Sequence, residues 1–166
     1  MNKINLKQYR ILAIAPSTRG FGFAVLEGRD TLVDWGVRNV QGNKNAQSIK
    51  KVEELITHYR PGAMVLQDTE DSRRAQRIKT LSHKIISMAV ARKVNVALFS
   101  HEQVRRVFFA DGQGTKHALA EILAQRFPEE LGSRLPPKRK PWMSEDYRMD
   151  IFDAVGLVVV FRMKTK

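Results

Sequence analysis

Two aspartates near the C-terminal end of the chain have the type and spacing to do chemistry. Asp150 and Asp153 directly precede the apolar run Ala154 to Phe161, so on a helix their carboxylates would share one face at the entrance to a buried segment. Neighbouring carboxylates repel each other unless a cation neutralises them, and a divalent metal ion prefers such oxygen ligands. The alternative is that Asp150 lies at the solvent edge and only Asp153 caps a helix or forms an ion pair.

A second acidic cluster lies in the middle of the chain. The segment Gln67-Asp68-Thr69-Glu70-Asp71 begins where the apolar run Ala63 to Leu66 ends. Active sites of open α/β sheets lie at such strand ends, which makes Asp68 a candidate catalytic residue. The alternative is an acidic turn with no catalytic role, in which Asp71 or Ser72 caps the next helix.

Basic residues dominate the charge of the protein. With 29 Lys and Arg against 17 Asp and Glu, the formal net charge is +12, which favours a polyanionic partner such as nucleic acid. The basic residues gather in three groups, which are Arg73, Arg74, Arg77, Lys79 and Lys84; Arg105, Arg106 and Lys116; and Arg134, Lys138, Arg139 and Lys140. A solvated surface would explain any one group, whereas three groups of one sign predict phosphate contacts.

Composition excludes several other classes of protein. The 166 residues include no cysteine, so a disulfide framework and a thiolate metal site are ruled out. The four histidines have no metal-ligand spacing. No apolar run approaches the roughly 20 residues of a membrane span, and the first residues lack the apolar core of a signal peptide. We therefore expect a cytoplasmic protein without membrane contact.

The elements that must position these residues form an alternating α/β pattern. Three short strands at 10–14, 21–26 and 32–37 predict an antiparallel meander. Helices are predicted at 45–60 and 72–93, each followed by a strand, at 63–66 and 94–99, with further helices at 101–109 and 115–127. The proline-rich stretch 128–143 predicts an exposed basic loop.

The last segment is ambiguous between strand and helix, because it is rich in β-branched residues. Ser144 as an N-cap, with Glu145 and Asp146 in the first turn, favours a helix. No internal repeat is visible, so the prediction is a single domain over residues 1–166.

Four segments, taken in order, resemble the RuvC family of Holliday junction resolvases over nearly the whole chain. The stretch Ile11 to Gly22 resembles the opening motif, with Ala15 where the family has Asp. The stretch Pro61 to Gln67 resembles the second motif, with Gln67 at the position of the catalytic Glu. Asp150 to Ala154 matches the closing pair of aspartates. Glu102 to Lys116 is similar to a segment in which a lysine near the active site, here Lys116, helps to bind DNA.

The resemblance implies an RNase H-like α/β fold with a mixed five-stranded sheet, which combines the meander with parallel strands and is flanked by helices. It further implies a homodimer that hydrolyses DNA strands near a four-way junction with Mg²⁺ or Mn²⁺. Asp150 and Asp153 would hold metal, residue 67 would bridge it when it is Glu, and Lys116 would neutralise the phosphate. The expected DNA-binding residues are Arg19, Arg73, Arg74, Arg77, Lys79, Arg105, Arg106, Lys116, Lys138, Arg139 and Lys140.

The departures from the family pattern leave alternatives open. Ala15 offers no oxygen for a metal, and Gln67 offers only a neutral carbonyl. Either these residues were introduced in the laboratory, or the lineage has changed its site and binds without cutting, or cuts with Asp68 as a substitute ligand. The rival functions are therefore a catalytically inactive branched-DNA-binding protein and an RNA-processing nuclease of the related RuvX-like branch.

Overall fold

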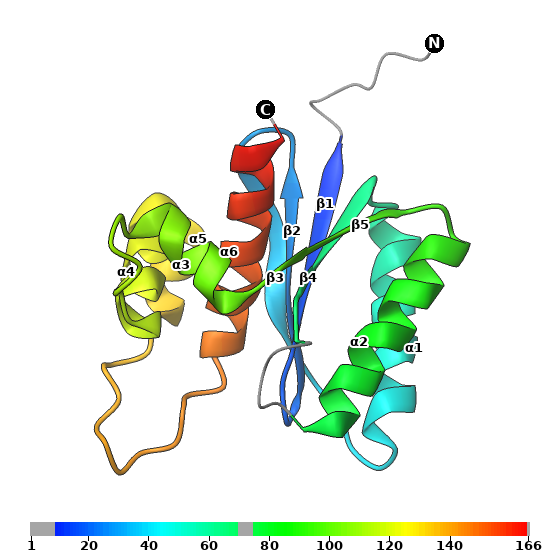
Figure 1. The fold of residues 1–166 in the computed structure, drawn as a ribbon, viewed down its shortest axis with the longest axis horizontal. Coiled ribbons are helices and arrows are strands. Elements are labelled where there is room, and N and C mark those ends of the chain that lie inside the picture. The colour runs from blue at the N-terminus through cyan, green and yellow to red at the C-terminus, as the bar shows by residue number, and fades with distance from the viewer. Residues whose placement is uncertain (1–8, 70–74, 166) are drawn as a thin grey trace.

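A five-stranded mixed sheet is the centre of the molecule (Figure 1). The computed structural model describes residues 9–69 and 75–165. The strands are β1 (Arg10–Pro16), β2 (Gly20–Glu27), β3 (Thr31–Asn39), β4 (Ala63–Gln67) and β5 (Asn95–Phe99), in the order β3-β2-β1-β4-β5. β2 pairs antiparallel with β1 and β3, whereas β4 pairs parallel with β1 and β5. The predicted meander and the mixed sheet are both confirmed.

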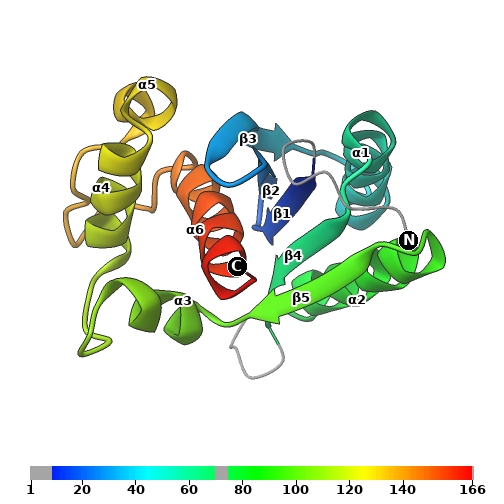
Figure 2. The same ribbon diagram turned by 90° about the horizontal axis from the view of Figure 1, so that it is seen from above.

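Helices cover both faces of the sheet (Figure 2). One face packs against α1 (Lys44–Tyr59) and α2 (Gln76–Ala91), and the other packs against α6 (Met149–Lys164). Beyond α6 lie α3 (His101–Phe108), α4 (Lys116–Arg126), α5 (Pro128–Leu131) and the short 3₁₀ turn η1 (Gly132–Arg134).

The two cores follow from the alternation of side chains along β1. Leu12 and Ile14 face α1 and α2, whereas Ile11, Ala13 and Ala15 face α6. Because β1 is buried on both faces, the alternation does not appear in its sequence as an apolar and polar pattern.

Several boundaries differ from the predicted ones. The second long helix starts at Gln76, and Ser72, at which we expected it to begin, lies outside the described residues. The predicted loop 128–143 contains α5 and η1 at its start, because Pro128 suits the first turn of a helix. The segment from Leu135 to Pro141 is irregular, as its three prolines require.

The C-terminal segment is a helix, but its predicted N-cap is wrong. α6 begins at Met149, its N-cap residue is Arg148, and no side chain caps it. Asp146 accepts hydrogen bonds from the backbone N–H and the guanidinium of Arg148, and these bonds hold the chain in a turn ahead of the helix. Glu145 and Asp146 therefore lie before α6 and not in its first turn.

Candidate functional site

The first turns of α6 lie tightly against β2. Asp150 is 7% exposed and Asp153 is half-buried. A Cβ atom on Gly22 of β2 would lie only 2.1 Å from the backbone oxygen of Asp150. Glycine at this position therefore lets the helix approach the sheet closely enough to bury Asp150.

β1 and β4 both end close to these carboxylates. Ile14 is opposite Leu66 in the parallel pair, so the next residues, Ala15 and Gln67, lie near each other where the two strands end. Ala15 belongs to the core on the α6 side, and Gln67 has the same alternation as Val65, which also faces α6. Gln67, Asp153 and Lys116 line one pocket. The fold thus brings the residues of all four motifs together.

A third carboxylate, which the sequence did not indicate, completes the cluster. Glu145, Asp150 and Asp153 each place a carboxylate oxygen within 4.8 Å of the others. No spacing rule points to Glu145, because the chain between it and Met149 forms a turn and not a helix. Asp68 follows β4 and donates its backbone N–H to the Phe99 oxygen, and among the described residues it is not a member of the carboxylate cluster. Glu70 lies outside the described residues.

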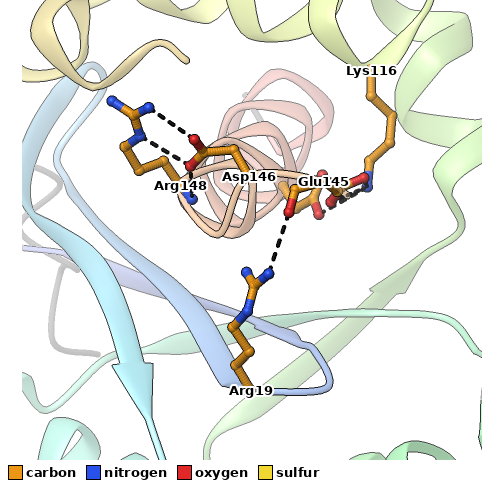
Figure 3. Close-up of polar contacts among 6 residues, drawn as sticks. Arg19, Lys116, Glu145, Asp146 and Arg148 are labelled. Carbon is orange, nitrogen blue, oxygen red and sulfur yellow. Dashed lines mark hydrogen bonds and ion pairs between the residues drawn. The ribbon is translucent and has the colours of Figure 1, made fainter. Parts of the chain in front are cut away.

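Lys116 is the positive charge of this cluster (Figure 3). Its Nζ lies 3.1 and 3.2 Å from the two carboxylate oxygens of Glu145, and 3.4 Å from Oδ2 of Asp153. Burial alone would lower the pKa of Lys116, but the carboxylates of Asp153 and Glu145 outweigh it and raise the pKa above its ordinary value. The ammonium group therefore stays charged and neutralises part of the acidic cluster.

Among the described residues, Asp150 does not share the ion pairs that Lys116 forms with Glu145 and Asp153. Its Oδ2 atom is buried and has no hydrogen-bond partner among residues 9–69 and 75–165. Burial raises the pKa of Asp150 to about 6; the nearby Ser17 side chain lowers it, while the charges on Asp153 and Glu145 raise it further. A buried carboxylate oxygen without a donor, beside two other carboxylates, is a suitable ligand set for a hard divalent cation.

Arginines hold the segments that surround the site. The Arg77 guanidinium donates to the Ser17 carbonyl, at 3.2 Å, and to the Asn45 side-chain oxygen, at 3.1 Å. Arg19 donates to the Glu145 carbonyl at 3.4 Å (Figure 3). Both arginines were predicted to bind DNA, and both also fix the positions of backbone groups next to the carboxylates.

The other predicted DNA-binding residues have different surroundings. Lys138 and Arg139 line a second pocket together with Lys116 and Glu145. Arg105 lines the first pocket, and its Nε atom is buried without a partner in the described part of the chain. Arg106 forms an exposed ion pair with Glu102, Lys79 is half-buried and Lys140 is exposed. Arg73 and Arg74 lie outside the described residues.

Comparison with known proteins identifies the fold. No protein-family model and no curated protein matches the sequence. Among solved structures, the chain is similar to Thermus thermophilus RuvC in complex with a Holliday junction substrate, with a TM-score of 0.68 and 18% identity over 95% of this chain and 97% of that one. It is also similar to a second Thermus thermophilus RuvC structure, with a TM-score of 0.67 and 19% identity over 94% of this chain and 97% of that one.

None of the described helices is long and apolar enough to cross a membrane. The mixed five-stranded sheet with its flanking helices matches the fold of these solved structures over nearly the whole chain. The chain therefore has the RNase H-like fold of RuvC.

Proposed function

We propose that this protein is a structure-selective endonuclease that cuts branched DNA, such as a Holliday junction, with the help of Mg²⁺ or Mn²⁺. The observation that carries the proposal is the cluster of Glu145, Asp150 and Asp153 around Lys116 at the ends of β1 and β4. This cluster lies where the RuvC resemblance expects a catalytic centre, in a fold that matches RuvC over nearly its whole length.

The three carboxylates would hold the cation. Asp150 contributes a buried oxygen without a partner, and Glu145 supplies negative charge that Ala15 and Gln67 do not provide. A divalent cation at this site would lower the pKa of a water molecule and stabilise charge on a phosphate. Asp68 is not needed for this ligand set.

The protein's own cations would bind the DNA backbone. Lys116 lines both pockets, so its ammonium group can exchange a carboxylate for a phosphate oxygen when DNA enters. Lys138 and Arg139 continue the positive surface away from Lys116 along the second pocket. A row of cations that leads to the carboxylates would place a strand of DNA across them.

A homodimer is part of the proposal. A four-way junction has two equivalent strands to cut, so two identical centres related by a two-fold axis match its symmetry. Light scattering on the protein is expected to give about twice the chain mass of 19.0 kDa. A monomer, both free and bound to DNA, would favour the RuvX-like RNA-processing alternative.

A second candidate function is the binding of branched DNA without cutting. It is favoured by Ala15, which is 2% exposed in an apolar core and offers no ligand oxygen, and by Gln67, whose side chain carries no charge. With two anionic ligands missing, a pair of metal ions would be bound weakly.

Cutting assays on a labelled four-way junction, a linear duplex, single-stranded DNA and RNA, each with Mg²⁺ and with Mn²⁺, test the proposal. We expect slow cutting of the junction and little cutting of the linear duplex. Tight junction binding with no cutting in either metal would support the second candidate, and preferential cutting of RNA would support the RuvX-like alternative.

A further inference from the structure

The loop before α6 carries the most exposed large apolar side chain in the described part of the chain. Trp142 is 78% exposed, and Met143 and Tyr147 follow it at 48% and 47%. An indole ring in water leaves a large apolar area unburied, and such an area in a folded protein commonly marks a binding surface.

The tip of this loop has a defined shape. The backbone N–H of Met143 donates to the Lys140 carbonyl at 2.9 Å, which closes a turn with Trp142 inside it. The Lys140 Nζ atom lies 5.6 Å from the centre of the Trp142 ring. Lys138, Arg139 and Lys140 are all exposed, so the stretch that leads to the indole ring is positively charged.

Both ends of the loop are anchored beside the candidate site. The Pro136 carbonyl lies 3.0 Å from Nε2 of His117, the residue that follows Lys116. At the other end, Glu145 binds Lys116 through its side chain and Arg19 through its carbonyl. An exposed tip on a fixed base is suited to contact a ligand without a large loss of conformational entropy.

The distance from the tip to the site is short. Trp142 precedes Glu145 by three residues, and an extended chain spans at most about 3.6 Å per residue. The two Cα atoms are therefore no more than about 11 Å apart, which is the rise of roughly three stacked base pairs.

We propose that Trp142 is a stacking platform for an unpaired or unstacked DNA base close to the phosphate at the site. The ring supplies the face on which a base stacks, and Lys138, Arg139 and Lys140 supply the charge that attracts the backbone on either side of that base. Fully paired DNA keeps its bases stacked inside the helix, so Trp142 selects branched or locally opened DNA. This inference rests on the proposed function.

The test compares the affinities of the unaltered protein and three variants for a four-way junction, a fork with unpaired bases and a linear duplex, by fluorescence anisotropy at one salt concentration. Trp142→Ala is expected to weaken binding to the junction and the fork by roughly 5- to 150-fold, and to change duplex binding by no more than about twofold. Trp142→Phe keeps an aromatic face and should retain most of the affinity. Val90→Ala, the matched control, removes exposed apolar surface from α2, on the opposite face of the sheet from α6, and should behave as the unaltered protein.

A second readout follows the ring itself. The chain has two tryptophans, so Trp35→Phe leaves Trp142 as the sole fluorophore of its kind. Its emission should be quenched by the fork more than by the duplex, because stacking places a base on the ring.

Equal losses on all three DNAs, or no loss on any, would overturn the stacking proposal. Binding of DNA by the unaltered protein keeps the two proposals distinguishable. If the protein binds junctions and Trp142→Ala binds them equally well, only the stacking proposal fails; if it binds no DNA, the proposed function fails with it.

Discussion

Asp150→Asn tests the electrostatics of the site without any substrate. The pKa of Asp150 is raised from 3.8 to about 6 in the folded protein, chiefly by burial. At about 1.36 kcal/mol per pKa unit, ionised Asp150 destabilises the folded state by up to about 3 kcal/mol. Asparagine has nearly the same shape and no charge, so the variant should be more stable than the unaltered protein near pH 7.5.

The pH dependence fixes the sign of this effect. Between pH 3.8 and about 6 the folded protein binds more protons at Asp150 than the unfolded chain does, so its stability falls as pH rises through that window. Below the window Asp150 is protonated in both states, and the advantage of the Asn variant should shrink towards zero.

Urea unfolding of both proteins from pH 3.5 to 8, in buffer with a chelator, measures the difference. Asp153→Asn is the matched control. Asp153 forms an ion pair with Lys116 at 3.4 Å, so removing the negative charge of Asp153 should lower stability at pH 7.5. An Asp150→Asn variant that is less stable than the unaltered protein at pH 7.5, or a difference that does not vary with pH, would refute the reasoning.

Four further predictions follow from the geometry. Gly22→Ala should lower the free energy of unfolding by about 3 kcal/mol in urea titrations, because its methyl group would collide with the backbone of Asp150; an unchanged value would show that α6 can move away at little cost. Arg77→Ala should cost about 2 kcal/mol in the same assay, because the Ser17 carbonyl and Asn45 lose charged donors. Lys116→Met should raise Mn²⁺ affinity in calorimetry, because the cation that competes for Glu145 and Asp153 is gone; weaker Mn²⁺ binding would contradict this. Gln67→Glu should increase the rate of junction cutting and Ala15→Asp with Gln67→Glu should increase it more, both gains being abolished by Asp153→Asn.

The sequence could predict the architecture because the relevant patterns are local. The meander, the two helix and strand units and the buried faces of α1 and α2 follow from apolar periodicity and turn residues. The closing aspartates could be identified because their spacing places both on one helix face. Their burial at the site depends on Gly22 of β2, which is distant in the sequence.

Glu145 could not be identified from the sequence, because its position depends on contacts that are not local in the chain. Its position is set by a turn in which Asp146 binds Arg148 and by contacts with Lys116 and Arg19, residues from other parts of the chain. Local rules favoured Ser144 as a cap, whereas this turn starts the helix later, at Met149. Such tertiary contacts override capping preferences and have no signature in a single sequence.

Single-turnover cutting of a four-way junction in Mn²⁺ tests most directly whether the cluster of Glu145, Asp150 and Asp153 is the catalytic centre. The unaltered protein, Glu145→Gln and Asp30→Asn are compared side by side. Asp30 is an exposed acid that pairs with Arg126 outside the carboxylate cluster, so its change of charge is the matched control. The account predicts slow cutting by the unaltered protein, the same rate for Asp30→Asn and loss of cutting for Glu145→Gln. Equal rates for all three proteins, or junction binding without any cutting by the unaltered protein, would contradict it.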